Sequence, residues 1–515
     1  MAPSSPTEVA RPALTPSERH LAPDARLQSA DLTRSGSLPR AWVAGWSASP
    51  DAPLLREPDG RAVTTGRMEE ATRIAAGRLV AAGLRPGDRV LWSTGPTIDA
   101  VVAHVGALRA GLVVVPVNTA STAAELAHLV RDVRPAGAIA ADPARAARAL
   151  AASPGAPVIA DPSLGSLPAP VGDCVLDAAS PGDPALICYT SGTTGVPKGA
   201  VLTHRNLLAA TRSVTMAWRW TPDDRLVHAL PVFHAHGLCV GLYGTLLAGA
   251  SAVLLPAFDP AEVADAAERH RATLFFGVPT MYHRLAGSGH LGRLAGLRLC
   301  VSGSAPLAVD LHRRASAQLG TTVLERYGLS ETLMDVSNPW EGERRPGTVG
   351  FPLPGVEVGL AADGEILVRG PNVFGGYWER PVATAEAFLA ADDGGPDWFR
   401  TGDLGAVEDG YLAIRGRSKE LVISGGFNVY PAEVEEVLAT HPAVAEVAVT
   451  GTPSDEWGEV VTAWVVADGP PPSAADLAEF TADRLAPYKR PRIVHVVDRL
   501  PRNALGKVLR GALGR

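Results

Sequence analysis

The chain has 515 residues, of which 46% are hydrophobic and 20% are charged, and its formal net charge is −7. This length exceeds one ordinary hydrophobic core, so two or three domains are expected. The acidic balance gives no electrostatic footprint for nucleic acid, and no apolar run reaches the roughly 18 residues of a membrane span. The composition therefore predicts a multidomain globular protein without a nucleic-acid partner.

The segment from Met1 to about Arg40 is rich in Pro, Ser, Ala and Arg and lacks the apolar stretch of a secretory signal. We interpret it as a mobile N-terminal extension, and the expected compartment is the cytoplasm. The four cysteines show no metal-ligand spacing, so we expect small buried thiols. These cysteines are Cys174, Cys188, Cys239 and Cys300.

Helix-like and strand-like patterns alternate from about residue 42. The predicted elements are a helix over 68–82, a strand over 89–92, a helix over 98–110 and a strand over 112–116. The same alternation returns around 200–255 and 273–300. It predicts a doubly wound α/β body with largely parallel sheets.

The amino-acid composition and the pattern of predicted elements change twice in the last third of the chain. Gly and Pro become frequent after about residue 340, which predicts a small β-rich subdomain over about 341–416. Beyond it we expect an α/β domain over 419–515, behind a large N-terminal domain over 41–418. Its predicted elements are a helix over 431–438, paired strands over 444–450 and 460–466, a helix from Ser473 to Leu485 and a strand over 493–497.

Lysine is almost absent, since only four of the 47 basic residues are lysines. Arginine is a planar, always-charged fork, whereas lysine carries a compact charge on a slim stem. A chain with this bias is expected to retain lysine where arginine cannot serve, although any single lysine can survive by chance. The four lysines are Lys198, Lys419, Lys489 and Lys507.

Residues 189–199 combine hydroxyls, glycines and one lysine directly after the apolar strand 185–188. Glycines allow backbone N–H groups to approach a ligand, hydroxyls donate to phosphate oxygens, and Lys198 adds charge. The segment is not a Walker A loop, because Pro197 precedes Lys198 and Gly199 follows it. It predicts a phosphate-binding loop of another kind.

This loop resembles the phosphate loop of the adenylate-forming superfamily, which contains acyl-CoA synthetases, luciferases and adenylation domains. Further matches follow in the family's order from about residue 185 to residue 510. The resemblance implies a large N-terminal domain and a small mobile C-terminal α/β domain. It also implies an ATP and AMP site formed by Thr190, Ser191, Gly192, Thr193, Thr194, Gly195, Lys198, Gly303, Ser304, Ala305, Pro306, Glu325, Arg326, Tyr327, Gly328, Ser330, Asp403 and Arg417.

The same resemblance assigns catalytic roles. Lys507 would bridge the carboxylate and the α-phosphate, and Thr190 would act beside it. Glu331 would help hold Mg²⁺, a hard cation that prefers carboxylate and phosphate oxygens. Lys419 occupies the hinge position, where the C-terminal domain rotates between the two half-reactions. The CoA tunnel would be lined by Ser424, Gly425, Gly426 and Phe427.

Two segments, 231–237 and 277–284, are similar to malonyl-CoA synthetases, in which a histidine and an arginine hold the distal carboxylate. His236 and Arg284 are the candidates, and an ion pair between Arg284 and a nearby acid is the alternative. Asp335 would oppose a dicarboxylate. Three further residues could open space for a bulkier acid: Gly241, Leu242 and Gly244. The expected acyl pocket contains His234, His236, Gly237, Met281, Arg284 and Leu329.

The expected activity is an AMP-forming acyl-CoA synthetase that uses Mg²⁺, ATP, CoA and a carboxylic acid that is malonate-like or bulkier. One alternative releases acyl-AMP, or passes the acyl group to a carrier-protein thiol or a downstream acyltransferase. Another is a non-catalytic nucleotide-binding relative. The substrates supply both nucleophiles, so the lack of a Ser-His-Asp order is no objection.

Overall fold

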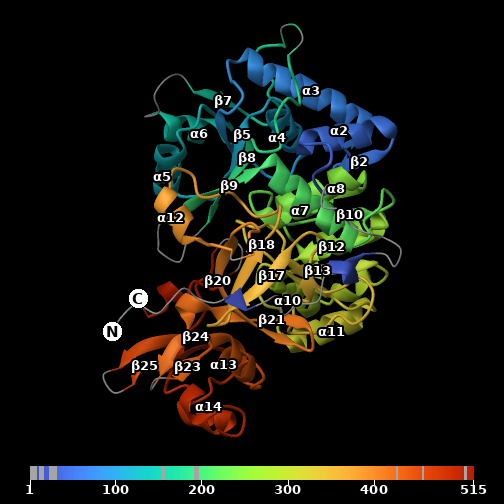
Figure 1. Cartoon of the computed structure of the whole chain (residues 1–515). Helices are drawn as coiled ribbons and strands as arrows, with labels where there is room; N and C mark the ends of the chain where they lie inside the picture. The colour runs from blue at the N-terminus through green and yellow to red at the C-terminus, as the bar shows by residue number, and fades with distance from the viewer. Residues whose placement is uncertain are drawn as a thin grey trace. The chain divides into compact units, whose positions relative to one another are not determined.

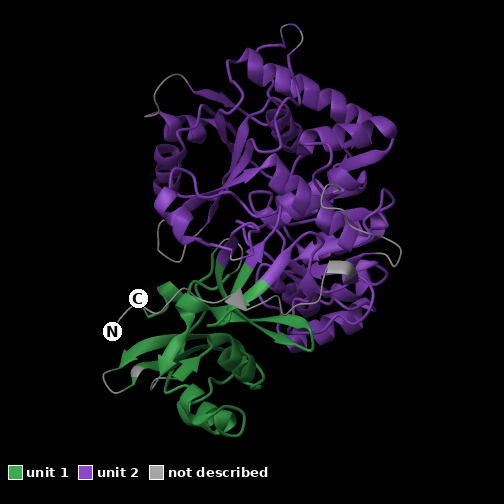
Figure 2. Cartoon of the chain, in the orientation of Figure 1, with its two compact units in different colours: residues 1–13, 359–367, 401–515 green, residues 14–358, 368–400 purple. Residues whose placement is uncertain are grey.

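The computed structural model describes residues 9–10, 17–21, 32–151, 157–170, 172, 174–190, 197–391, 393–424, 427–454, 457–503 and 507–514. Residue contacts divide the chain into two compact units (Figure 2). Unit 1 comprises residues 1–13, 359–367 and 401–515, and unit 2 comprises residues 14–358 and 368–400. No helix among the described residues has the length and apolarity needed to cross a bilayer.

One sheet of unit 2 is parallel except at one edge. Its described strands follow the order β7–β6–β4–β5–β8–β9, and the pairing of β8 with β9 is antiparallel. The strands are β4 (Arg89–Ser93), β5 (Val113–Pro116), β6 (Gly137–Ala140), β7 (Val158–Ala160), β8 (Pro184–Thr190) and β9 (Lys198–Thr203). The accompanying helices are α3 (Thr65–Ala81), α4 (Ile98–Arg109), α5 (Ala123–Val133) and α6 (Pro143–Leu150).

Close packing of α3 on α4 stabilises one side of this region (Figure 1). A Cβ atom added at Gly106 of α4 would lie 2.7 Å from the Cβ of Ala75 on α3, so only glycine permits this approach. Leu126 and Leu129 of α5 pack into a buried cluster with Val115 of β5. The same cluster contains Ile187 of β8, the strand that leads into the predicted phosphate loop.

The second sheet of unit 2 follows the order β16–β15–β14–β13–β12–β10–β11–β2–β3 within the described residues. Its strands are β2 (Pro53–Arg56), β3 (Ala62–Thr64), β10 (Arg225–His228), β11 (Ser251–Leu254), β12 (Leu274–Gly277), β13 (Leu299–Ser302), β14 (Leu324–Tyr327), β15 (Val336–Ser337) and β16 (Phe351–Pro352). The accompanying α-helices are α2 (Leu38–Ala48), α7 (His204–Ala217), α8 (Tyr243–Ala248), α9 (Pro260–Arg269), α10 (Pro279–Gly287) and α11 (Val309–Leu319). A π-helix over His236–Leu242 precedes α8.

A third sheet contains β1 (Val9–Ala10), β17 (Glu357–Ala361), β18 (Glu365–Arg369), β19 (Phe388–Leu389), β20 (Trp398–Glu408) and β21 (Tyr411–Arg417), with α12 (Pro381–Glu386) beside β19 in sequence. The C-terminal part of unit 1 has its own sheet of β22 (Val422–Ser424), β23 (Phe427–Val429), β24 (Val444–Ser454), β25 (Gly458–Ala467) and β26 (Ile493–Val496). Helices α13 (Pro431–Leu438) and α14 (Ala474–Ala482) contribute Val434, Leu438 and Leu477 to its core.

The expected fold class is confirmed, since parallel strands and helices alternate through unit 2 and a smaller α/β sheet follows. The helix expected from Ser473 also forms, because Ser473 and Asp476 make a reciprocal capping box. It ends at Ala482 rather than Leu485. The strands expected over 444–450 and 460–466 pair with each other as parts of β24 and β25, and their pairing is antiparallel.

The first forty residues are more ordered in part than their composition predicts. Val9 and Ala10 pair with Ala361 and Leu360 of β17. The ring of His20 is buried and lies 3.1 Å from the carbonyl oxygen of Phe351. Backbone pairing and burial of this kind need partners distant in sequence, which local composition does not reveal.

Candidate active site

The phosphate-loop segment connects the two antiparallel strands β8 and β9. Thr190 ends β8 and lies opposite Lys198, which begins β9. The Thr190 hydroxyl donates to the Lys198 carbonyl at 3.5 Å. Five predicted phosphate-binding residues lie outside the described residues: Ser191, Gly192, Thr193, Thr194 and Gly195. The two described ends of the loop are therefore brought together.

Glu331 lies in the turn between β14 and β15 and is only 8% exposed. Its Oε1 accepts a hydrogen bond from the hydroxyl of Tyr377 at 3.0 Å. The Lys198 ammonium lies 5.2 Å from the centroid of the same tyrosine ring, which is a cation–π distance. Tyr377 thus contacts both the predicted phosphate lysine and the predicted Mg²⁺ carboxylate.

The turn that carries Glu331 is specified by its neighbours. A Cβ atom at Gly328 would clash with the Leu333 carbonyl, so glycine is required for this close approach. The Thr332 hydroxyl donates to Asp335 at 2.5 Å, and the buried Asn372 amide donates to the other oxygen of Asp335 at 3.0 Å. Tyr327, Leu329 and Ser330 are half-buried around this turn.

Glu325 and Arg326 are adjacent on β14 and are each 6% exposed. Burial raises the pKa of Glu325 to about 7, although backbone N–H groups of Leu307 and Gly347 donate to it and act in the opposite direction. Burial lowers the pKa of Arg326 to about 10, and the nearby charge of Asp335 opposes that shift. The predicted nucleotide segment therefore contains two strongly perturbed groups.

Arg326 lies beneath the loop that follows β13. A Cβ atom at Gly303 would clash with the Arg326 guanidinium, so this glycine makes room for it. Arg326 Nη2 donates to the Ser304 hydroxyl at 3.5 Å, and that hydroxyl lies 3.3 Å from Nδ1 of His236. Ser304 has a left-handed φ of 71° and, like Ala305 and Pro306, is exposed.

His236 begins the π-helix and is 6% exposed. Burial lowers its pKa well below the usual value, and the charge of Arg326 adds to the effect. Burial also lowers the pKa of the neighbouring His234 to about 4. The imidazoles are therefore neutral at neutral pH. A Cβ atom at Gly237 would clash with the Pro231 carbonyl, so glycine closes the turn that leads into this helix.

The structure does not bring Arg284 together with His236. Arg284 is exposed on α10, and its guanidinium carbon lies 4.9 Å from the ring centroid of Phe258. Among the described residues it makes no ion pair, which is the alternative that the sequence left open. Met281, one helical turn earlier, is 8% exposed. The nearby charge of Asp335 acts on Arg326, whose pKa it raises.

The expectation of extra acyl space at the π-helix is wrong at two of its three positions. A Cβ atom at Gly241 would lie 2.9 Å from Nδ1 of His228, and one at Gly244 would clash with the Trp220 indole. These glycines accommodate neighbouring side chains. Leu242 is fully buried.

Unit 1 brings together three other predicted residues. Asp403 is 4% exposed, lies opposite Arg417 in the β20–β21 pair and forms an ion pair with Arg417 Nε at 3.0 Å. Glu365 accepts from the N–H of Gly402 at 2.9 Å and so holds the turn before Asp403. Lys507 is half-buried. Burial lowers its pKa, the charge of Arg417 adds to that shift, and Asp403 opposes it.

The remaining predicted residues of unit 1 are scattered. Lys419 is exposed in a short 3₁₀ turn over Ser418–Glu420. Ser424 is buried, and Phe427 is 57% exposed and stacks on Tyr488 with 4.7 Å between ring centroids. Gly425 and Gly426 lie outside the described residues. The fourth lysine, Lys489, is structural, since its ammonium pairs with Glu433 at 2.6 Å.

Sequence reasoning missed Tyr377 and its neighbour Trp378. The Trp378 N–H donates to the Gly199 carbonyl at 2.7 Å, and its indole N–H donates to the Asp132 carbonyl at 3.3 Å. The only local signal was two aromatic residues after Gly375 and Gly376. Nothing in that pattern indicates which strand they pair with.

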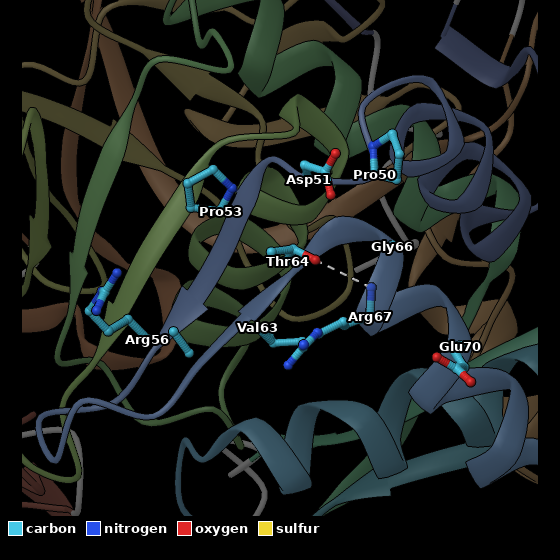
Figure 3. A pocket seen from close by; sticks show the side chains of 10 residues that line it. Pro50, Asp51, Pro53, Arg56, Val63, Thr64, Gly66, Arg67 and Glu70 are labelled. Atoms are coloured by element: carbon cyan, nitrogen blue, oxygen red, sulfur yellow. Dashed lines mark hydrogen bonds between the residues drawn. The ribbon is translucent and has the colours of Figure 1, made fainter.

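A surface pocket of about 590 Å³ lies elsewhere on unit 2 (Figure 3). Its lining comes from the β2–β3 hairpin and the start of α3, where the Thr64 hydroxyl accepts from the N–H of Arg67 at 3.4 Å. None of its lining residues belongs to the predicted site.

The doubly wound body and the smaller α/β sheet agree with two family models of adenylate-forming enzymes. The family model of AMP-binding enzymes matches residues 43–378, and the model of the AMP-binding enzyme C-terminal domain matches residues 433–507. A feruloyl-CoA synthase from Amycolatopsis sp is 38% identical over 498 residues, which cover 91% of this chain and 96% of that protein.

Another relative and a solved structure are also similar to this chain. A mitochondrial malonate–CoA ligase from Mus musculus is 39% identical over 371 residues, which cover 63% of each chain. The crystal structure of ATP-bound MatB from Rhodopseudomonas palustris superimposes with a TM-score of 0.85 at 40% identity, covering 93% of this chain and 98% of that one. The chain belongs to the AMP-binding enzyme family and is an AMP-forming carboxylic acid–CoA ligase.

Proposed function

We propose that this ligase activates a short acid that carries a second carboxylate, and that Arg326 rather than Arg284 binds that group. The observation that carries the proposal is the buried guanidinium of Arg326. Its Nε has no hydrogen-bond partner among the described residues, and its contact with Ser304 is long at 3.5 Å. The nearby charge of Asp335 acts on the guanidinium but does not satisfy this buried N–H group, which an anionic ligand group would do.

Three further features favour a small dicarboxylate over a bulky acid. The neutral imidazole of His236 lies beside the same Ser304 hydroxyl and can donate or accept a hydrogen bond. Trp220 and His228 fill the space that Gly241 and Gly244 leave. A malonate–CoA ligase is among the relatives, although a feruloyl-CoA synthase is another.

The proposed reaction has two steps. A carboxylate oxygen of the acid attacks the α-phosphorus of ATP, and pyrophosphate leaves. The sulfur of CoA then attacks the carbonyl carbon of the acyl-adenylate, and AMP leaves. We assign Lys507 to charge stabilisation at the α-phosphate, Asp403 to the ribose hydroxyls and Arg417 to the same nucleotide. Their grouping in unit 1 supports a common ligand.

Mg²⁺ fits the residues around Glu331. The carboxylate is largely buried, is oriented by Tyr377 and offers the hard oxygen ligand that this cation prefers. Bound there with ATP, the ion would neutralise phosphate charge. Thr190 and Lys198 are assigned to the phosphates.

The CoA half-reaction retains the roles expected from the family. We propose Lys419 as the hinge of a C-terminal domain over 419–515, with Ser424 and Phe427 beside the pantetheine chain. Transfer to a carrier protein has no supporting observation. Accumulation of acyl-AMP in the presence of CoA would favour that alternative.

A matched pair of variants tests the substrate proposal. Arg326→Gln should raise the KM for malonate about 10- to 150-fold, because a hydrogen bond to a charged group contributes about 1.5–3 kcal/mol. The KM for propionate, which lacks the second carboxylate, should change far less. Arg284→Gln is the control and should leave both values close to wild type.

Pyrophosphate release, measured for malonate, succinate, propionate, a fatty acid and ferulate, provides the readout. A selective loss of malonate use in Arg284→Gln instead would restore the sequence-based assignment. Wild-type preference for ferulate or the fatty acid would overturn the dicarboxylate proposal.

A further inference from the structure

The segment over 376–378 is attached to the first residues of β9 by backbone pairing. The Trp378 N–H donates to the Gly199 carbonyl at 2.7 Å, and the Val201 N–H donates to the Gly376 carbonyl at 3.1 Å. Tyr377 forms an antiparallel bridge with Ala200 between these bonds. This pairing places Tyr377 beside the strand that leaves the phosphate loop.

The tyrosine is also held from its other side. Its N–H donates to the Thr384 hydroxyl at 2.9 Å, and its ring packs edge-on against Phe374 with 4.8 Å between centroids. The Phe374 N–H in turn donates to the Glu331 carbonyl at 2.9 Å. A Cβ atom at Gly376 would lie 2.5 Å from Thr384 Cγ2, so a larger residue there would displace the segment. The position of the ring is therefore set by several independent contacts.

The hydroxyl and the ring face of Tyr377 lie beside two groups of opposite charge, Glu331 and Lys198. The hydroxyl donates to Glu331 Oε1 at 3.0 Å, and the ring face lies 5.2 Å from the Lys198 ammonium. A hydrogen bond orients one carboxylate oxygen without neutralising it, and a cation–π contact restrains an ammonium without occupying its N–H donors fully. One residue thus restrains both the predicted Mg²⁺ ligand and the predicted phosphate lysine.

We propose that Tyr377 is a positioning residue for Mg·ATP, acting on the metal through Glu331 and on the phosphates through Lys198. This inference rests on the proposed function, because it takes Glu331 and Lys198 in the roles given there.

The two contacts can be separated by substitution. Tyr377→Phe keeps the ring under Lys198 and removes only the hydrogen bond to Glu331. Tyr377→Leu removes both. Tyr189→Phe is the matched control, since Tyr189 lies on β8 and its hydroxyl donates to Asp132 of α5 at 2.6 Å rather than to Glu331.

The test measures ATP binding by equilibrium dialysis with and without Mg²⁺, in the absence of any acid. In Tyr377→Phe, the factor by which Mg²⁺ tightens ATP binding should fall about 3- to 10-fold, while the metal-free Kd stays within twofold of wild type. Tyr377→Leu should weaken metal-free binding as well. Tyr189→Phe should retain the wild-type Mg²⁺ factor, and thermal unfolding of all variants identifies any loss of folding.

The outcomes distinguish the role proposed for Tyr377 from the proposed function of the protein. An unchanged Mg²⁺ factor in folded Tyr377→Phe overturns the role of Tyr377 and leaves the proposed function intact. Equal loss in Tyr189→Phe shows a structural effect of the hairpin and also overturns it. Wild-type protein that binds no ATP overturns both.

Discussion

Glu325 and Arg326 are adjacent on β14, but their side chains contact different parts of the predicted site. Side chains alternate between the two faces of a strand, so Glu325 and Arg326 meet different partners. Glu325 accepts backbone N–H groups of Leu307 and Gly347, whereas Arg326 reaches Ser304. The first links loops that flank the predicted adenine site, and the second leaves a cation available to a ligand.

The raised pKa of Glu325 predicts a pH-dependent contribution to stability. Its folded pKa of about 7 exceeds the usual 4.5, so the contribution is complete below pH 4.5 and is lost as pH rises to about 7. Relative to Glu325→Gln, the wild-type free energy of unfolding should fall by about 3 kcal/mol over that range. Urea unfolding of both proteins between pH 4.5 and 8 measures the difference.

The exposed Glu479→Gln on α14 controls for the loss of one negative charge. A difference between wild type and Glu325→Gln that does not vary with pH would contradict the assignment.

At this scale the sequence did not indicate which arginine is buried. Arg284 and Arg326 both lie in segments that match the family, and their local sequences do not reveal exposure. The neighbouring Gly303 and Phe258 decide it, because one makes room for a guanidinium and the other supports one at the surface.

The π-helix over His236–Leu242 departs from the regular α-helical repeat and carries His236, a predicted residue of the acyl pocket. Such helices occur often at functional sites because the extra residue per turn redirects side chains. It continues into α8, where Gly244 lies against Trp220. Trp220 packs edge-on against Phe276, and Phe276 stacks near His236. The geometry of the histidine therefore depends on this glycine.

Gly244→Ala is expected to destabilise the protein by about 1–3 kcal/mol, because the added methyl group displaces the Trp220 indole in a packed core. Gly45→Ala in α2 is the matched control. No atom lies within 4 Å of its added Cβ, and it should stabilise the helix by about 0.5–1 kcal/mol. Thermal and urea unfolding distinguish them, and equal effects of both substitutions would argue against the packing explanation.

The start of a helix was predicted where the sequence contains a local start signal and was missed where it contains none. Ser473 predicted the start of α14, and Pro431 predicted the start of α13. The π-helix has no such signal, since its irregular period does not appear as a 3.6-residue repeat.

For the whole molecule, the chain enters unit 1 three times, through residues 1–13, 359–367 and 401–515. The predicted domains were continuous segments that meet at Lys419. That boundary stays a prediction, and the two family models, 43–378 and 433–507, leave it between them. Sequence texture detects a change in composition, whereas contacts group segments that are remote in sequence.

The hinge proposal makes a prediction at this scale. Lys419→Pro would restrict φ at the residue that we propose changes conformation between the half-reactions. The first half-reaction needs no rotation, so the rate of pyrophosphate exchange should stay within about threefold of wild type. Such a change in rate is smaller than the tenfold change that corresponds to about 1.4 kcal/mol. Thioester formation from presynthesised acyl-AMP should fall at least about tenfold. Lys419→Ala, which leaves the backbone unrestricted, is the control, and equal losses in both half-reactions would refute the hinge role.

The sequence by itself determined the fold class and the family, because these signals lie in short contiguous segments with fixed spacing. Only the tertiary structure decided that Tyr377 reaches Glu331, 46 residues away, and that Arg326 is buried while Arg284 is exposed. The physical reason is that hydrogen bonding and burial depend on which strands and loops pack together, and that packing is cooperative over the whole core.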